Sequence, residues 1–386
     1  MKTAILFVTC FLYSIKSCDY ASRNAAADAQ NESNKDIAHP ASIPSSELDR
    51  YIHAIDDFYD SALDHPSFNG SFLVAKNGQI IYERYKGFGD FSKKDSLTSR
   101  HAFHIASISK TFTAMAALKL YEEGRLQLTD SLGKFFPGFP YQGITIQMLL
   151  SHRSGLPNYA YYLEKNKWDK KVRVTNAEVL QSLYTYQPKL DFTSGRRFAY
   201  CNTNYALLAL IIEKITGLPY AQYLRTTFFE PLGMDDTFVY TQADSARAMP
   251  SYEYNGKKWG FDYLDLVYGD KNIYSTVRDL LKWDQALYSN KFFKQSTLDS
   301  AFTPRSFEKP GIRNYGYGWR MLCYPTGKKV IYHNGWWHGN NSVLTRLVQD
   351  SATIIVLGNK RNNRIYRVKP LFEAFSHYNG NEEMEQ

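Results

Sequence analysis

Hydrophobic positions in the first part of the chain recur at the spacing of a helix. Between residues 46 and 58, Leu48, Ile52, Ile55 and Phe58 follow one another at intervals of three or four residues. Side chains at such intervals lie on one face of an α-helix. We therefore expect an amphipathic helix that packs by this face against the rest of the protein.

The next apolar residues form two short runs that are typical of β-strands. Residues 71–75 and 80–85 are rich in branched and aromatic side chains, and Asn77 and Gly78 stand between them. Asn-Gly between two such runs favours the tight turn of a β-hairpin. The pattern predicts a hairpin that begins a sheet.

A different pattern follows, in which residues 112–118 are apolar on almost every side. A helix that is apolar all round lies inside a protein. It is expected to begin near Ser107 and to end at Gly124, a residue type that commonly terminates helices. This buried helix is the element around which the chain is organised.

The middle of the chain, about residues 125–268, is predicted to be a mostly helical insertion, with helices at 144–150 and 204–215. Strand-like runs return near the end, and a last helix is expected from about 366 to 377. The runs are 330–332, 342–348 and 352–357. The economical arrangement is an α+β fold, in which an antiparallel sheet from both chain ends is flanked by helices. The active site is expected between the sheet and the helical part.

Composition describes a globular protein without a nucleic-acid partner. Of 386 residues, 44% are hydrophobic and 22% charged, which is enough apolar chain for a large core. The net charge is +8 and the isoelectric point about 9.0. Lysine and arginine occur only in short, scattered pairs, so the sequence predicts a solvated basic surface rather than a nucleic-acid stripe.

The N-terminal residues predict export. An apolar run that is too short to span a bilayer follows Lys2, so residues 1–17 are predicted to be a signal peptide. Cys18 follows as in a bacterial lipoprotein, which implies a periplasmic or cell-envelope protein with a lipid anchor; plain signal cleavage stays open as the alternative. Residues 18–45 are expected to be a flexible tether, 46–378 the folded domain and 379–386 a polar tail.

Two cysteines lie in the predicted domain, Cys201 and Cys323. Two cysteines this far apart in sequence carry little information about pairing, so a disulfide stays open. His101 and His104 have the spacing of a metal pair, but no matching ligand cluster follows them. No metal or other cofactor is expected.

Candidate chemistry begins at Ser107 and Lys110, where the buried helix starts. Residues three apart share a helix face, so the amine can lie beside the hydroxyl. A serine hydroxyl needs a neighbour that takes its proton, and burial of a lysine favours the neutral amine that can do so. This S-x-x-K pair is weak evidence alone, and two further motifs must agree with it.

The further motifs are Tyr200-Cys-Asn202 and His333-Asn-Gly335. Together with Ser107-Ile-Ser-Lys110, in this order, they resemble the motif set of serine β-lactamases and penicillin-binding proteins. The Y-x-N and H-x-G variants resemble the branch of class C β-lactamases, low-molecular-weight D,D-peptidases and esterases. The stretch from Leu149 to Pro157 and the stretch from Tyr315 to Trp319 are also similar to this family.

The resemblance implies a role for each motif residue. Ser107 would be the acylated nucleophile, Lys110 its proton acceptor and Tyr200 the group that passes a proton to the leaving group. A phenol with a pKa of about 10 could serve only with cations nearby, for which Lys110 and His333 are the candidates. Asn202 is expected to form hydrogen bonds with the substrate amide and with Lys110.

The third motif is expected to complete the site. His333 stands where relatives have a lysine, so its charge is expected to depend on pH in the neutral range. Gly335 belongs to the same motif. The oxyanion hole would consist of the backbone N–H groups of Ser107 and Trp336, the first at a helix N-terminus.

The sequence therefore predicts a serine hydrolase that forms an acyl-enzyme on Ser107. Its substrate is expected to be a small molecule or peptide with an amide or ester bond. D,D-peptidase, esterase and β-lactamase activities all stay open, with a peptidase or esterase-like enzyme favoured over a dedicated β-lactamase. The alternative is a non-catalytic envelope lipoprotein that binds cell-wall peptide or a protein partner. The oligomeric state is not predicted.

Overall fold

The largest sheet brings the two ends of the domain together. The computed structural model describes residues 42–378. In this part, an antiparallel sheet has seven strands in the order β2-β1-β12-β11-β10-β9-β8. The strands are β1 (Gly70–Lys76), β2 (Gln79–Lys86), β8 (Arg313–Tyr315), β9 (Arg320–Cys323), β10 (Lys329–Trp337), β11 (Asn340–Leu347) and β12 (Ala352–Gly358). Since β1 pairs with β12 from Gly70↔Gly358 to Lys76↔Ala352, the predicted sheet from both chain ends is confirmed.

The predicted hairpin is also confirmed. Strands β1 and β2 pair antiparallel, and Asn77 and Gly78 between them have φ of 51° and 75°. Positive φ at both positions is the requirement of a type I′ turn, which Asn and Gly meet at little steric cost. The local chemistry of two residues thus sets the pairing next to the turn, and a bulge between Val74 and Ala75 shifts the register beyond it.

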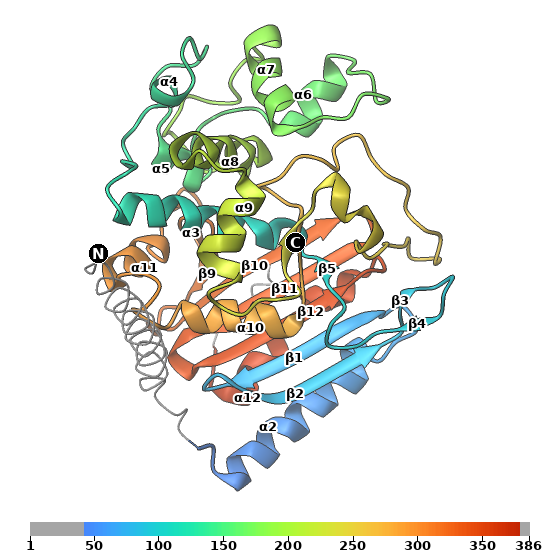
Figure 1. Ribbon diagram of the computed structural model, residues 1–386. Coiled ribbons are helices and arrows are strands. Elements are labelled where there is room, and N and C mark those ends of the chain that lie inside the picture. The colour runs from blue at the N-terminus through green and yellow to red at the C-terminus, as the bar shows by residue number, and fades with distance from the viewer. Residues whose placement is uncertain (1–41, 379–386) are drawn as a thin grey trace, which may run out of the picture. The chain divides into compact units, whose positions relative to one another are not determined.

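Helices of the middle segment cover one face of the sheet (Figure 1). The predicted buried helix is α3 (Ser109–Glu122), and it packs against α8 (Asn202–Thr216). Around them lie α4 (Leu132–Phe135), α5 (Ile146–Leu150), α6 (Tyr159–Lys165), α7 (Asn176–Tyr186), α9 (Tyr220–Leu224), α10 (Val277–Ala286) and α11 (Gln295–Ala301). Helices are the main regular elements of the segment 125–268, although loops take up more of it than helices do. Helix α8 ends at Gly217 in the left-handed conformation.

Short elements connect the helical part to the sheet. A second, three-stranded sheet contains β5 (Phe103–His104), β7 (Ile273–Ser275) and β6 (Phe238–Val239), which the hydrophobic pattern did not predict. Strands β3 (Phe88–Asp90) and β4 (Asp95–Ser96) form a separate pair. Because β5 immediately precedes the nucleophile turn, its pairing with β7 joins that turn to a segment about 170 residues later in the chain.

The opposite face of the large sheet is covered by the two ends of the domain. Helix α2 (Ser45–Phe58) is the predicted amphipathic helix, and it buries Ile55 and Phe58 there. The prediction of a single helix from 366 to 377 is wrong. The chain instead forms the 3₁₀ turns Asn363–Tyr366 and Lys369–Leu371 and the short α12 (Phe372–Phe375). Pro370 explains the break, because proline lacks the N–H that a continuous helix needs.

Several predictions concern residues outside the described range. The signal peptide 1–17, Cys18, nearly all of the tether and the tail 379–386 lie outside residues 42–378. No helix among the described residues is long and apolar enough to cross a membrane.

Cys201 and Cys323 are free thiols rather than a disulfide, and burial raises the pKa of Cys201 to about 11.

Candidate active site

The first motif forms a turn that places the hydroxyl and the amine together. Ser107 lies in the 3₁₀ turn Ala106–Ile108, and Lys110 lies in the first turn of α3. The Lys110 amine is 3.0 Å from Ser107 Oγ, so the predicted pair is formed. Ala106 before it has φ of 48°, an uncommon value for a residue with a side chain. Such local strain is characteristic of functional turns.

The Lys110 side chain is fully buried. Its amine donates a second hydrogen bond, of 2.8 Å, to the backbone carbonyl of Asp270. The rings of Tyr200 and Tyr205 lie 4.9 and 5.8 Å from the Lys110 nitrogen. The burial that the sequence predicted for this lysine is therefore present, although the groups that contact its amine are polar.

The second motif reaches the same place from the start of α8. Tyr200 lies between two basic side chains, since its ring centre is 4.9 Å from Lys110 Nζ and 5.1 Å from Arg320 Cζ. The sequence suggested Lys110 and His333 as the cations near this phenol. Arg320, on strand β9, takes the place expected for His333. The sequence pattern did not predict strand β9, so the position of Arg320 beside Tyr200 could not be predicted either.

His333 is close to Tyr200 but does not carry the expected charge. The side chain is fully buried on β10, with its ring 6.2 Å from the Tyr200 ring. Burial, together with the positive charges of Arg320 and Lys110, holds the pKa of His333 well below its usual value of 6.5. The prediction of a charge that changes in the neutral range is therefore wrong, and the imidazole is neutral there.

Asn202 is the first residue of α8 and follows Tyr200 by two residues in the chain. Its Oδ1 atom is buried without a hydrogen-bond partner in the described part of the protein, so the expected bond from Lys110 to this oxygen is not formed. A buried acceptor is costly when unpaired. The N–H of a substrate amide would satisfy it, which agrees with the other half of the prediction.

The third motif brings a strand against the nucleophile turn. A Cβ atom on Gly335 would lie 2.4 Å from the Ile105 carbonyl oxygen and 2.9 Å from the Ser107 nitrogen. Only glycine allows β10 to pass so close. Residue 335 therefore lies against the Ser107 N–H. Trp336, whose N–H is the second expected oxyanion donor, is the next residue of the strand.

The Trp336 side chain takes no part in that arrangement. Successive side chains of a strand point to opposite faces, so the indole turns away from the face of Gly335. It is 49% exposed, and its Nε1 donates to the His338 carbonyl oxygen at 2.9 Å. Its predicted role rests on the backbone alone.

His152 is a site residue that sequence reasoning did not assign. It lies 4.4 Å from the Tyr200 ring, and its Nδ1 accepts the Cys201 N–H at 3.1 Å. Burial and nearby positive charges hold the pKa of His152 well below 6.5, so Nδ1 stays free to accept. The resemblance of the stretch from Leu149 to Pro157 to the family drew attention to this region, but it did not indicate a role for His152. The ring supports the backbone between Tyr200 and Asn202.

Two pockets of about 460 and 620 Å³ lie near this cluster, although no motif residue is part of their walls. The larger one lies next to the second motif and includes Phe198, Ala199, Tyr315 and Arg320 in its walls. Its other charged wall residues are Arg197, Glu308, Lys309 and Arg313. Four basic side chains and one acidic side chain make it electropositive, and Glu308 is paired with Arg153.

Comparison with known proteins agrees with this geometry. A family model described as Beta-lactamase matches residues 55–374, which is most of the chain. The protein belongs to the β-lactamase family. It is thus a serine hydrolase, and the α+β fold predicted from the sequence is the fold of this family.

Relatives in the β-lactamase family include several penicillin-binding proteins. "Penicillin-binding protein 4*" of Bacillus subtilis is 33% identical over 329 residues, covering 80% of this chain and 72% of the relative. A "Putative penicillin-binding protein PbpX" of the same organism is 29% identical and covers 76% and 73%.

Solved structures share the fold at lower identity. A penicillin-binding protein from Bacillus halodurans has a TM-score of 0.69 at 21% identity and covers 84% of this chain and 97% of its own. A D-amino acid amidase from Ochrobactrum anthropi, complexed with D-phenylalanine, has a TM-score of 0.68 at 23% identity, with coverage of 86% and 99%. These likenesses establish the fold alone.

Proposed function

We propose that this serine hydrolase cleaves an amide bond whose leaving group carries a carboxylate, as in a peptide that ends in D-Ala-D-Ala. The observation that carries the proposal is the electropositive pocket beside the second motif. Its walls contain four basic residues, among them Arg197 and Arg320. An arginine guanidinium suits the planar geometry of a carboxylate.

The position of this pocket supports its assignment to the leaving group. Tyr200 is the residue proposed to protonate the departing nitrogen, and Arg320 lies 5.1 Å from the Tyr200 ring while also lining the pocket. A leaving group whose nitrogen faces Tyr200 would therefore extend toward Arg320. A carboxylate on the next carbon would enter the pocket and complement its charge.

The proposed reaction uses the remaining motif residues in two steps. Ser107 Oγ attacks the carbonyl carbon while the neutral Lys110 amine takes the hydroxyl proton. The carbonyl oxygen becomes negative and faces the N–H groups of Ser107 and Trp336. The C–N bond then breaks, Tyr200 gives its proton to the leaving amine, and Lys110 restores the proton to Tyr200. In the second step water attacks the carbonyl carbon of the Ser107 ester. The same groups then move the protons until the Ser107 hydroxyl is restored.

Similar proteins support an amide substrate over other classes. Relatives carry the name penicillin-binding protein, and one structure of the same fold is a D-amino acid amidase. The export predicted from residues 1–17 would place such an enzyme in the compartment that contains cell-wall peptides. A non-catalytic binding role would not require the Ser107–Lys110 contact to be kept.

The proposal is tested by comparing a peptide that ends in D-Ala-D-Ala with its C-terminal amide. We expect the wild-type protein to have a kcat/KM about 10 to 100 times higher for the acid, because a hydrogen bond to a charged group contributes about 1.5 to 3 kcal/mol. Arg320→Gln should reduce this preference, and Ser107→Ala should abolish turnover of both.

Equal rates for acid and amide in the wild type would rule out recognition of the carboxylate. Intact-protein mass spectrometry after incubation with a penicillin adds a second criterion. A long-lived adduct that disappears in Ser107→Ala agrees with a peptidase-type site, whereas rapid release of hydrolysed penicillin would mean that the enzyme is a β-lactamase.

A further inference from the structure

One segment of the chain forms hydrogen bonds with residues on both sides of the nucleophile turn. Residues 269–273, here called the clamp segment, lie along the first turns of α3. The Gly269 carbonyl accepts from Thr113 Oγ1 at 2.6 Å, and the Asp270 carbonyl accepts from the Lys110 amine at 2.8 Å. The Ile273 carbonyl accepts the Ile105 N–H at 2.9 Å. The clamp segment therefore fixes the lysine of the first motif.

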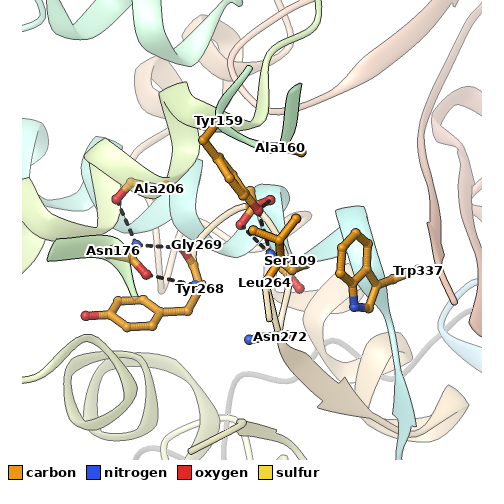
Figure 2. A network of polar contacts seen from close by, with 12 residues as sticks. Ser109, Tyr159, Ala160, Asn176, Ala206, Leu264, Tyr268, Gly269, Asn272 and Trp337 are labelled. Atoms are coloured by element: carbon orange, nitrogen blue, oxygen red, sulfur yellow. Dashed lines mark hydrogen bonds and ion pairs between the residues drawn. The ribbon is translucent and has the colours of Figure 1, made fainter. Parts of the chain in front are cut away.

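A polar network lies behind this segment and supports it. Asp270 and Lys271 are 1% and 3% exposed. The Lys271 amine donates to the Tyr159 hydroxyl at 2.6 Å, and that hydroxyl donates to Asp270 Oδ2 at 2.8 Å. The amine is also 3.7 Å from Asp270 Oδ1. In Figure 2 the Tyr159 side chain points into this network, and the Trp337 ring lies beside it.

The start of the clamp segment is held by a second anchor. Asn176 accepts the Tyr268 N–H and donates to the Tyr268 and Ala206 carbonyls, each at 2.9 Å (Figure 2). Tyr159 thus ties the clamp segment to α6. Asn176 of α7 holds Tyr268, the residue just before the segment, and is itself bonded to Ala206 of α8. These anchors come from the helical part of the fold, whereas Lys110 belongs to α3.

Stability alone does not account for this network. A buried ion pair has a large desolvation cost, and replacing such a pair by apolar residues is often neutral or stabilising. Asp270 Oδ1 has no hydrogen-bond partner among residues 42–378, which adds to the cost. Burial lowers the pKa of Lys271, while Asp270 opposes this change. The pair lies directly behind a hydrogen bond to the proposed base.

We propose that Tyr159, Asp270 and Lys271 are positioning residues for Lys110. Their bridged ion pair fixes the Asp270 peptide, so its carbonyl oxygen lies where one N–H of the Lys110 amine must point. Because this N–H is hydrogen-bonded to the Asp270 carbonyl, fewer orientations remain for the Lys110 amine. Its lone pair can then face the Ser107 hydroxyl proton. The inference rests on the proposed function, in which Lys110 removes that proton.

The two charges of the network should also act on Lys110 in opposite directions. Other titratable or charged groups face Lys110 as well, and the comparison must leave them unchanged. They are Tyr200 and Tyr205 at the start of α8, His152 after α5, Arg320 on β9 and His333 on β10. Removing the Lys271 cation makes the electrostatic potential at Lys110 more negative, and removing the Asp270 anion makes it more positive.

The experiment measures the acylation rate by a penicillin in single turnover, as a function of pH, on the full-length protein. In Tyr159→Phe we expect acylation to slow by about 10 to 100 times, because a small misplacement of a catalytic group has an effect of this size. Penicillin affinity should change by less than about twofold. Tyr162→Phe is the control, since this buried tyrosine on the same helix bonds to Ser182 instead.

The pH profile separates positioning from mere structural support. Lys271→Met should shift the acidic limb of the acylation profile to higher pH, and Asp270→Asn should shift it to lower pH. A structural defect would lower the rate without opposite shifts. If either charge variant fails to fold, the test rests on Tyr159→Phe. Slower acylation with unchanged penicillin affinity in this variant would support the positioning role.

The outcomes distinguish this inference from the proposed function. If the wild type forms a Ser107 adduct but Tyr159→Phe acylates as fast as Tyr162→Phe and both charge variants keep the wild-type profile, only the positioning role is overturned. If the wild type forms no Ser107 adduct, the proposed function and the positioning role are both overturned.

Discussion

At the scale of single residues, burial decides the charge of the histidines around the site. His104, His152 and His333 are each 3% exposed or less. Burial lowers the pKa of His104 to about 4 and holds the pKa values of His152 and His333 well below 6.5. All three rings are therefore neutral in the folded protein near neutral pH, where they act as hydrogen-bond partners.

These neutral histidines predict a pH-dependent stability. A pKa depressed in the folded state means that only the unfolded chain binds the proton between the folded pKa and about 6.5, so stability falls as pH is lowered through this window. Each ring contributes a slope of about 1.4 kcal/mol per pH unit. Urea unfolding between pH 7.5 and 5 should show this loss. In His104→Gln the slope of the free energy of unfolding against pH should be smaller by about 1.4 kcal/mol per pH unit, the contribution of one proton. An unchanged slope would show that His104 is not a source of the pH dependence.

At the scale of elements, the site depends on how closely β10 approaches the turn before α3. Residue 335 lies at the contact, where a Cβ atom would meet the Ile105 carbonyl oxygen and Ser342 Oγ at 2.4 Å each. Real Cβ atoms do not come so near to backbone, so any side chain must push the strand away. The same strand provides the Trp336 N–H.

Gly335→Ala is therefore expected to separate the two halves of the proposed oxyanion hole. Acylation by a penicillin should fall by about 100 times or more, because loss of one oxyanion donor has an effect of this order. Gly133→Ala is a suitable control, since the nearest atom to its added Cβ would be 3.8 Å away. Near-normal acylation in Gly335→Ala would show that the strand can yield without damage to the site.

At the scale of the whole domain, the large sheet separates two apolar cores. The core on the side of α3 and α8 surrounds the site, and the other lies under α2 and α12. A buried ion pair joins α10 to the sheet, where Arg346 of β11 and Thr353 of β12 both donate to Asp284. Arg346 and Asp284 are 1% and 2% exposed.

Removing one member of this pair should destabilise the domain without altering the chemistry. Asp284→Ala is expected to lower the free energy of unfolding by about 3 to 5 kcal/mol, because it leaves a buried arginine without its partner charge. The exposed Asp299→Ala serves as control. Denaturant unfolding gives the difference, and acylation measured at a temperature where both variants remain folded should match the wild type. A loss below 1 kcal/mol would contradict this role.

The sequence alone predicted what depends on neighbours along the chain. The turn at Asn77 and Gly78 and the contact between Ser107 and Lys110 need only local geometry, because their partners are one or three residues apart. Burial of α3 also followed from its apolar surface. The α+β arrangement and the motif residues came from the order of elements and from resemblance to the family.

Tertiary structure alone decided the charges and the supports of the site. His333 is neutral because Arg320, Lys110 and the surrounding core come from separate segments, so its electrostatic environment is not encoded in any one of them. The clamp segment contacts Lys110 from about 160 residues away, and Tyr159 joins it from another helix. Local pattern specifies elements and reactive pairs, whereas burial and electrostatic interaction depend on distances that only the folded chain defines.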